Sequence, residues 1–294
     1  LLEDLCTDTS SGHNIKKTVF IDCGQEYYPD GPEQFKPVGE TEFVVEIAGQ
    51  ARSDQSQAQI AGIIGHANMM LGSSVKEVLE QHLEKGNGLF RGIRHAGGWD
   101  EDERVKNAHS HPTPHIYLED KFQEGLQELS SLNMVFDTWH YHNQIQDLTE
   151  LAKNLPDLVI IHDHFGGPLG IGPYKGKREE IFEQWKEDIH DLSQCKNVYS
   201  KLGGLAMPVN GWDWHKREKP ATSDEIISEQ GSYYLYTLDC FGSERCMFES
   251  NFPVDKQSVS YPVIWNAYKK LVKDFEETDK ENLFYRTAEK VYKL

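Results

Sequence analysis

Apolar and polar residues occur in blocks along this chain, and one block stands out at residues 158–167. The run Leu-Val-Ile-Ile at 158–161 has the length of a strand and is followed by His162, Asp163 and His164. A turn rich in glycine and proline comes next, before a polar helical segment begins near Lys177. This pattern predicts a buried parallel strand, and the side chains where such strands end are the first candidates for a site.

The same succession of an apolar strand and a longer helix repeats along the whole chain. Strands are predicted at residues 17–22, 59–66, 89–95, 134–142, 158–164, 197–203 and 244–251. Helices are predicted at residues 40–50, 74–85, 118–131, 144–154, 178–192, 224–240 and 262–273, with a last one from residue 279. Strands and helices that alternate at this spacing predict an α/β fold with one parallel sheet, and no linker divides residues 1–294 into separate domains.

Two parallel architectures fit this alternation. A closed (β/α)8 TIM barrel has eight strands, whereas the pattern gives seven. Because the chain begins without methionine, we expect strand one of a barrel to lie upstream of Leu1, which would leave this domain incomplete at its N terminus. An open doubly wound sheet would carry Gly-x-Gly-x-x-Gly after its first strand, and residues 22–26, Asp-Cys-Gly-Gln-Glu, do not fit that motif. The sequence therefore predicts the TIM barrel.

Net charge and cysteine content indicate which partners and which cellular compartment are expected. The 294 residues carry a formal net charge of −18, which argues against nucleic acid or an anionic membrane as partner, since both attract clustered positive charge. The five cysteines are scattered and odd in number, so a reducing, cytoplasmic location is expected. No apolar run approaches the roughly 20 residues of a membrane span. We expect a small-molecule substrate as the partner, and a homo-oligomer remains open.

Polar side chains gather at the predicted carboxyl ends of the strands, which face one mouth in a parallel barrel. Because side chains alternate along a strand, His140 and His142 should share one face, as should His162 and His164. Imidazoles and carboxylates together suit a divalent metal, zinc or manganese, and hydrolysis by hydroxide generated from water. Arginine suits a substrate carboxylate, although a structural ion pair would also explain it. The expected mouth residues are Asp22, His66, Arg91 or Arg94, His95, His142, His164, Lys201, Glu249 and Asn251.

Three further segments carry weaker signals. The glycine-rich residues 166–173 lack the spacing of a phosphate-binding loop and are interpreted as a rigid loop that shapes the pocket. His109, His111 and His115 could bind metal, but two prolines lie between them and a solvated loop is the favoured interpretation. Trp212 and Trp214 could close over a substrate, and simple loop packing explains them equally well.

Four segments in this order resemble a known family. Residues 90–95 (Phe-Arg-Gly-Ile-Arg-His), 161–168 (Ile-His-Asp-His-Phe-Gly-Gly-Pro), 201–205 (Lys-Leu-Gly-Gly-Leu) and 241–254 look like the amidohydrolase-related TIM-barrel hydrolases. The members most similar in character are lactonases that act on fuconolactone, sulfomuconolactone and pyrone-dicarboxylate. The resemblance runs from about Lys17 to the C terminus. It implies a (β/α)8 barrel and hydrolysis of a lactone or a similar carbonyl compound.

The resemblance also implies roles for individual residues. His164 matches the histidine that ends strand six in the family, where it binds metal or polarises the substrate carbonyl. His142 occupies the end of strand five, where many members place another ligand. Arg94 matches an arginine that can hold a substrate carboxylate, and Lys201 on strand seven is a further pocket candidate.

Two departures from the family pattern alter this assignment. The His-x-His of strand one is absent from this chain, so a complete metal site of the family type cannot be built from it. Asn251 stands where the family has an aspartate that acts as ligand and base, and an amide cannot accept a proton at neutral pH. We therefore expect Glu249, served by an inner layer formed by His140 and His162, to be the acid/base carboxylate. The equally weighted alternative is that Glu249 is buried and paired with Lys201 or Arg245.

The sequence thus predicts a hydrolase that opens a lactone or similar carbonyl bond in a carboxylated small molecule. A metal-dependent non-oxidative decarboxylase and a barrel that binds without turnover are the alternatives. The assigned residues are His164, Glu249 and Asn251 for catalysis, Arg94, His95, Lys201 and Trp212 for substrate binding, and His142 with His164 for metal.

Overall fold

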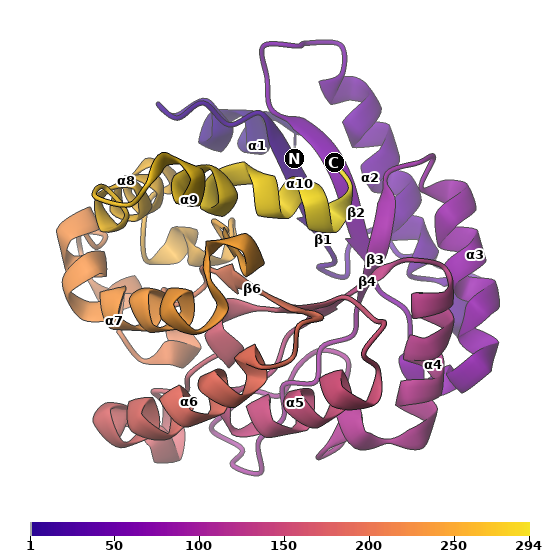
Figure 1. The fold of residues 1–294 in the computed structure, drawn as a ribbon. Helices are drawn as coiled ribbons and strands as arrows, with labels where there is room; N and C mark the ends of the chain where they lie inside the picture. The colour runs from indigo at the N-terminus through magenta and orange to yellow at the C-terminus, as the bar shows by residue number, and fades with distance from the viewer. Residues whose placement is uncertain (1) are drawn as a thin grey trace.

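The computed structural model describes residues 2–294 and contains one parallel sheet whose strands follow the order of the sequence (Figure 1). The strands are β1 (Lys17–Ile21), β2 (Gln59–Gly65), β3 (Phe90–Arg94), β4 (Val135–Thr138), β5 (Ile160–His162), β6 (Val198–Leu202) and β7 (Cys246–Phe248). Every neighbouring pair is parallel, from β1 with β2 to β6 with β7. The sheet curls into an α/β barrel, as the sequence predicts.

Helices surround the curled sheet, all but the last of the larger ones on its outer side (Figure 1). They are α1 (Leu2–Thr9), α2 (Val38–Ala51), α3 (Lys76–Lys85), α4 (Asp120–Ser131), α5 (Ile145–Asn154), α6 (Arg178–Ser193), α7 (Ser223–Phe241), α8 (Tyr261–Leu271), α9 (Glu277–Glu281) and α10 (Thr287–Tyr292). Helix α7 begins with a capping box in which Thr222 Oγ1 accepts from the Glu225 amide. Helix α1 lies in the polar opening, where the sequence analysis expected only turns. No helix among the described residues is both long and apolar enough to cross a membrane.

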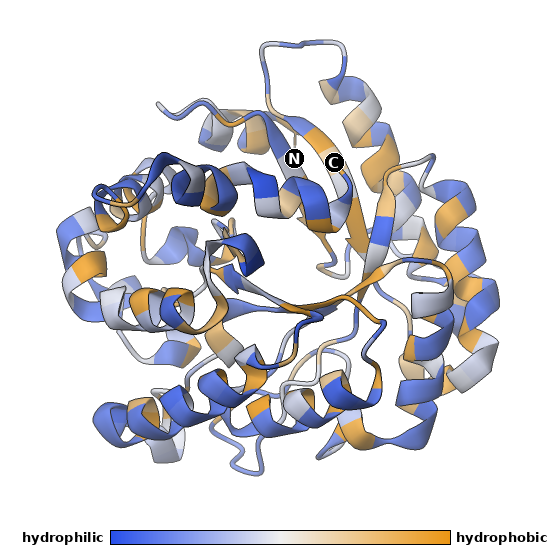
Figure 2. Ribbon diagram, in the orientation of Figure 1, coloured by the Kyte–Doolittle hydropathy of each residue, from blue (hydrophilic) through white to orange (hydrophobic). Residues whose placement is uncertain are grey.

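Alternation along the strands produces two apolar cores. On β5, Ile160 packs in the large core between the sheet and the helices, whereas Ile161 points into the barrel. Figure 2 accordingly shows hydrophobic residues along the strands and hydrophilic ones over much of the outer helices. This alternation places every second strand residue on the axis of the barrel.

The strands are shorter than predicted at their carboxyl ends, and this changes where the histidines point. Strand β4 was expected to reach His142, but it ends at Thr138 and a 3-10 turn follows at His142–Gln144. The Gln144 side chain causes this exit, because it donates to the Gly97 carbonyl and accepts from the Tyr141 amide. Strand β5 ends at His162, and His164 adopts a positive φ of 53°. The simple alternation that would put His140 with His142, and His162 with His164, is therefore wrong.

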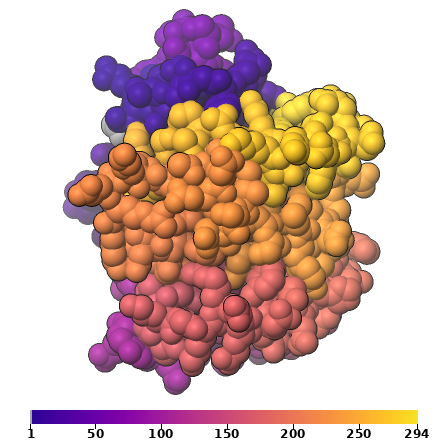
Figure 3. Space-filling view, turned by 90° about the vertical axis from the view of Figure 1, so that its left-hand side faces the viewer, coloured from indigo at the N-terminus to yellow at the C-terminus, as the bar shows by residue number. Residues whose placement is uncertain are grey.

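The C-terminal helix seals the interior of the barrel. Val291 and Tyr292 of α10 pack against inward-facing apolar side chains of the strands, including Ile64 and Met247. The Tyr292 hydroxyl donates to Asp137 Oδ2 at 2.9 Å, and both side chains are buried. The two ends of the chain are neighbours as well: Lys256 forms an ion pair with Asp8, and Figure 3 shows the N-terminal segment against the C-terminal helices.

Truncation of Tyr292 should destabilise the protein strongly, because its ring fills the barrel interior. We expect Tyr292→Ala to lower the free energy of unfolding by about 3–5 kcal/mol and Tyr292→Phe, which removes only the hydroxyl, by about 1–2 kcal/mol. Urea unfolding of both variants measures this. Tyr285→Ala is the matched control, since Tyr285 lies just before α10 and is 42% exposed. Equal losses for Tyr285→Ala and Tyr292→Ala would contradict this view of the interior.

A buried neutral histidine should make the fold acid-sensitive. His82 Nε2 donates to the His66 carbonyl and His82 Nδ1 accepts from Thr41, and burial lowers the pKa of His82 from 6.5 to about 4. Because the unfolded chain binds this proton more readily, stability present above about pH 6.5 is lost as the pH falls towards about 4. The loss from this group is about 3 kcal/mol at most. Denaturation of His82→Gln across this range should show a shallower decline than His190→Gln, whose histidine is exposed; identical declines would refute the assignment.

Candidate active site

A buried lysine lies at the centre of the barrel mouth. Lys201, which is 5% exposed on β6, has its Nζ 2.7 Å from Asp137 Oδ1, 3.1 Å from Asp163 Oδ1 and 3.5 Å from Glu249 Oε2. Burial alone would lower the pKa of Lys201, but the three carboxylates raise it well above its usual value. Lys201 therefore carries a positive charge that β4, β5 and β7 surround with carboxylates.

Glu249 connects this lysine to a histidine. Its Oε1 lies 2.5 Å from His164 Nδ1, while its Oε2 faces Lys201. Burial would raise the pKa of Glu249, but the charges of His164 and Lys201 outweigh it and lower that pKa to about 2. Gly204 permits this arrangement because it has no side chain: a Cβ there would come within 2.4 Å of His164 Nδ1.

Arg94 joins the lysine network to the first strand. Its guanidinium lies 3.7 Å from Asp22 Oδ2 and 4.0 Å from Asp163 Oδ2, and it also donates to the Asp22 carbonyl. Burial raises the pKa of Asp163 well above its usual value, by more than the Lys201 charge lowers it. The carboxylates of Asp22, Asp137, Asp163 and Glu249 thus outnumber the two permanent cations of the mouth. This negative surplus favours a bound cation or a shared proton.

Asp22, His66 and His109 form a cluster of metal-type ligands on the side of β1 and β2. One donor atom from each lies within 4.8 Å of the others, and His109 Nε2 is 3.5 Å from Asp22 Oδ2. Burial would raise the pKa of Asp22, but the nearby His109 and the charge of Arg94 hold it well below its usual value. Strand geometry predicts Asp22 and His66 at the mouth, whereas the loop that carries His109 was expected to be solvated.

The predicted metal pair His142 and His164 is not brought together. His142 Nδ1 accepts from the Leu169 amide and its ring packs on Tyr174, whereas His164 is engaged with Glu249. The early end of β4 at Thr138 is the reason, since it turns His142 towards the loop at residues 168–174. Among the described residues, the two histidines belong to no cluster of three potential ligands.

The predicted inner histidine layer lies on the other side of the sheet. His140 and His162 are fully buried with ring centroids 5.3 Å apart, and His140 also contacts Tyr117. His162 follows Ile160 and Ile161 in alternation, so it shares the helix-facing side with Ile160. These two histidines therefore pack behind the sheet and cannot serve Glu249.

The remaining predicted residues contact the protein itself. His95 is 3% exposed, accepts from the Met69 amide and packs on Phe122 of α4. Asn251 Nδ2 donates to Asp255 Oδ1 at 2.9 Å. Trp212 is covered by the guanidinium of Arg178, 3.5 Å from its ring centroid, which agrees with the loop-packing alternative.

Asp137 and His109 are the site residues that sequence reasoning missed. Asp137 stands between Phe136 and Thr138 in a fully buried strand, and a charge at an inward-facing position of such a strand was a usable signal. His109 was considered as a possible metal ligand together with His111 and His115, but the solvated-loop interpretation was favoured, because its place depends on how a long insertion folds back.

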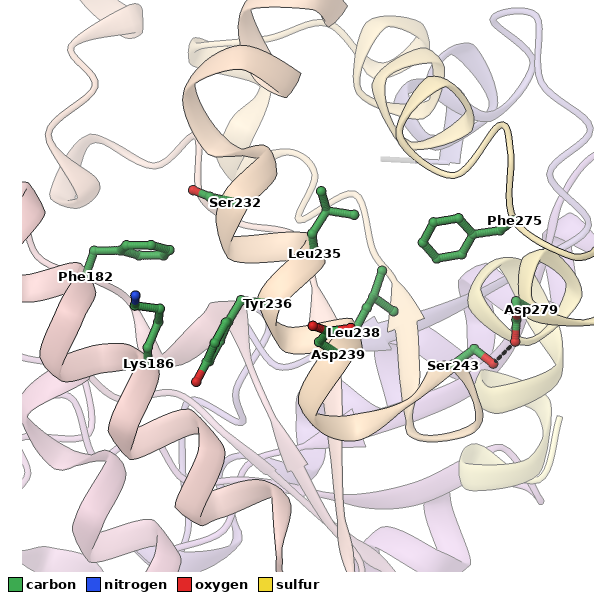
Figure 4. Close-up of a pocket in the computed structure, with 10 residues that line it drawn as sticks. All are labelled: Phe182, Lys186, Ser232, Leu235, Tyr236, Leu238, Asp239, Ser243, Phe275 and Asp279. Atoms are coloured by element: carbon green, nitrogen blue, oxygen red, sulfur yellow. Dashed lines mark hydrogen bonds between the residues drawn. The ribbon is translucent and has the colours of Figure 1, made fainter.

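A pocket of about 500 Å³ lies away from this mouth, between α6, α7 and residues 275–279. Figure 4 shows Phe182, Lys186 and Tyr236 on its one side and Phe275 on the other, with Ser243 bonded to Asp279. Its lining comes from the outer helical layer and includes none of the mouth residues. The candidate active site is therefore the ring of charged side chains at the strand ends.

Solved structures share this fold. An amidohydrolase from Burkholderia multivorans with bound zinc superposes with a TM-score of 0.70 at 17% identity and covers 96% of this chain and 100% of that one. A probable 2-pyrone-4,6-dicarboxylic acid hydrolase from Acinetobacter baumannii with citric acid bound has a TM-score of 0.61 at 14% identity, covering 100% and 89%. A 5-carboxyvanillate decarboxylase from Novosphingobium aromaticivorans, complexed with manganese and 4-hydroxy-3-methoxy-5-nitrobenzoic acid, has a TM-score of 0.59 at 11% identity, covering 98% and 79%.

Sequence comparison identifies the family. An uncharacterized protein of Sinorhizobium fredii is 30% identical over 294 residues, which cover 100% of this chain and 86% of that protein. An L-fucono-1,5-lactonase of Burkholderia multivorans is 23% identical over 257 residues, covering 87% of this chain and 77% of the lactonase. A sequence model of the amidohydrolase family matches residues 22–294. The fold, the charged mouth and this match over nearly the whole length agree that the chain belongs to the amidohydrolase family.

Proposed function

We propose that this amidohydrolase hydrolyses a lactone or similar carbonyl bond in a carboxylated small molecule. The observation that carries the proposal is the 2.5 Å contact between His164 Nδ1 and Glu249 Oε1 at the mouth, beside the charge of Lys201. The lactonase among the relatives and the pyrone-dicarboxylate hydrolase among the structural neighbours support this reaction class. Five cysteines that are all unpaired fit the expected cytoplasmic location.

His164 is the general base of the proposed reaction, and Glu249 positions it. Glu249 Oε1 lies 2.5 Å from His164 Nδ1, and its negative charge favours the tautomer with the proton on Nδ1, which leaves Nε2 with a lone pair for a proton from water. A carboxylate whose pKa is lowered to about 2 is a poor base at neutral pH, so Glu249 suits this supporting role better than direct proton transfer. Glu249, which the sequence predicted to be the acid/base carboxylate, is therefore proposed to position His164 instead. Asn251, bonded to Asp255, supports the loop after β7.

The two cations of the mouth serve the substrate. Arg94 is 16% exposed and its guanidinium is shared between two carboxylates at 3.7 and 4.0 Å, both longer than a good ion-pair hydrogen bond. One nitrogen of the guanidinium donates to the Asp22 carbonyl, and the weak carboxylate contacts of the others leave them available to a substrate carboxylate. Lys201 is held too tightly to move and supplies positive potential where negative charge develops on the carbonyl oxygen.

A divalent cation is part of the proposal, since neighbours with the same fold hold zinc or manganese. Asp22, His66 and His109 would hold it, and they fit because a carboxylate and two imidazoles are ligands that zinc prefers. When bound, such a cation polarises the substrate carbonyl as a Lewis acid.

Non-oxidative decarboxylation is the second candidate, favoured by the manganese-containing decarboxylase that shares the fold. The two reactions differ in their products. The intact protein is incubated, with and without zinc or manganese, with a panel of carboxylated lactones and hydroxybenzoic acids, while acid release and carbon dioxide are both recorded. We expect acid release from a lactone without carbon dioxide. Carbon dioxide would establish the decarboxylase, and binding of panel compounds without any product would establish the barrel that binds without turnover.

Removal of the carboxylate that positions His164 should reduce turnover more than binding. We expect Glu249→Gln to lower kcat for the best lactone by about 100-fold or more, because the base loses its fixed tautomer and counter-charge, with KM within about threefold. Steady-state kinetics measures both constants. Glu244→Gln, at the exposed start of the same β7 segment, is the control and should match the unmodified protein. An unchanged kcat in Glu249→Gln would exclude the proposed pair.

A further inference from the structure

We propose that Asp22, His66 and His109 form a zinc site that fastens the insertion between β3 and α4, residues 95–119, to the strand ends. Two of the ligands, Asp22 and His66, directly follow β1 and β2, whereas His109 belongs to the insertion. The inference rests on the metal part of the proposed function and not on the substrate or the reaction. It adds a structural task for the cation, namely to hold a covering segment in place.

The spacing of the donor atoms suits one small cation. Zinc binds nitrogen and oxygen at about 2.0–2.1 Å in a tetrahedron, which separates neighbouring ligand atoms by about 3.3 Å. His109 Nε2 and Asp22 Oδ2 are already 3.5 Å apart, and the whole set lies within 4.8 Å. Among residues 2–294 no other group of three such side chains meets this spacing. Three protein ligands leave a fourth position open.

The two ligands of the sheet are oriented with free donor atoms. His66 Nδ1 is 3.0 Å from the Arg94 carbonyl, to which it donates, so that Nε2 keeps its lone pair. This backbone contact is the support that metal-bound histidines usually have. Asp22 is 0% exposed, and its Oδ1 accepts from the Tyr27 hydroxyl at 3.1 Å. Its Oδ2 is buried without a hydrogen-bond donor among the described residues, which is costly unless an ion or water satisfies it.

The insertion presents His109 on a braced turn. The Ala108 amide donates to the Gly98 carbonyl at 2.7 Å, and Ser110 Oγ donates to the Ala96 carbonyl. His109 is thus held between two contacts to the first residues of the same insertion, just after β3. Its side chain is nevertheless 53% exposed, and it reaches the strand ends through Asp22 and through the His66 ring, whose centroid is 6.0 Å away.

The root of the insertion is anchored without help from any metal. The Asp100 carboxylate accepts from the Tyr174 hydroxyl at 2.6 Å and from Asn143 at 3.2 Å. Val105 packs in a small apolar cluster with Tyr141 and Leu169. These contacts hold residues 100–105 against the segments that follow β4 and β5, and the cation would restrain the insertion further along, at His109.

Arg94 is the internal competitor for this site. Its Nε lies 3.7 Å from the same Asp22 oxygen that faces His109. Arg94 also lies 4.0 Å from Asp163 Oδ2, so it would keep this carboxylate as a partner if a cation occupied Asp22. Metal binding and release of Arg94 towards the interior of the mouth are thus expected together.

The test is zinc titration of the intact protein, followed by limited trypsin digestion. Arg104 and Lys106 are exposed trypsin sites within the insertion, and Arg217 is an exposed site in another loop. We expect one zinc ion per chain by calorimetry and about tenfold slower cleavage after Arg104 and Lys106 with zinc, with cleavage after Arg217 unchanged. Magnesium, which prefers oxygen ligands, should give no protection.

His109→Asn and His111→Asn are the paired variants, since both histidines are exposed in the same insertion. His109→Asn should bind zinc at least about tenfold more weakly and lose the protection, while His111→Asn should behave like the unmodified protein. Zinc affinity and protection that survive His109→Asn would overturn the inference, as would a protein that hydrolyses lactones without binding zinc. Zinc binding with protection but without any hydrolysis would instead overturn the proposed reaction and leave this site intact.

Discussion

The buried ammonium group of Lys201 is the constraint on which the strand ends depend. A lysine that is 5% exposed is tolerated only where carboxylates replace its hydration shell. Removing one charged partner from such a buried network lowers the free energy of unfolding by about 3–5 kcal/mol. Asp137, Asp163 and Glu249 from three strands meet this requirement. Because β6 carries the lysine, its ion pairs help to fix the positions of β4, β5 and β7 relative to β6.

From this centre, charged contacts extend in both directions around the mouth. On one side Glu249 is shared between Lys201 and His164, so the proposed base is oriented by the same group that neutralises the lysine. On the other side Asp163 leads to Arg94, and Arg94 leads to Asp22 and the histidine cluster. The base, the cation for a substrate carboxylate and the candidate metal ligands are thus parts of one network rather than separate sites.

The sequence predicted the parts of this network that follow from strand geometry. Buried parallel strands are nearly continuous apolar runs, so β1 to β7 could be located, and the rule that their ends converge found Asp22, Arg94, Lys201 and Glu249. The rule failed for His142 because Gln144 captures the Gly97 carbonyl and ends β4 early. It failed for His109 because a loop position depends on contacts distant in sequence, such as those of Asp100 with Tyr174. Local patterns carry no information about either contact.

The most direct measurement of the central claim is an experimental structure of the protein with the hydroxy acid that forms when a carboxylated lactone is opened. The account predicts the product at the strand ends, with its new hydroxyl group donating to His164 Nε2 and its original carboxylate on Arg94. Product bound instead in the outer pocket between α6 and α7, with the mouth unchanged, would contradict it.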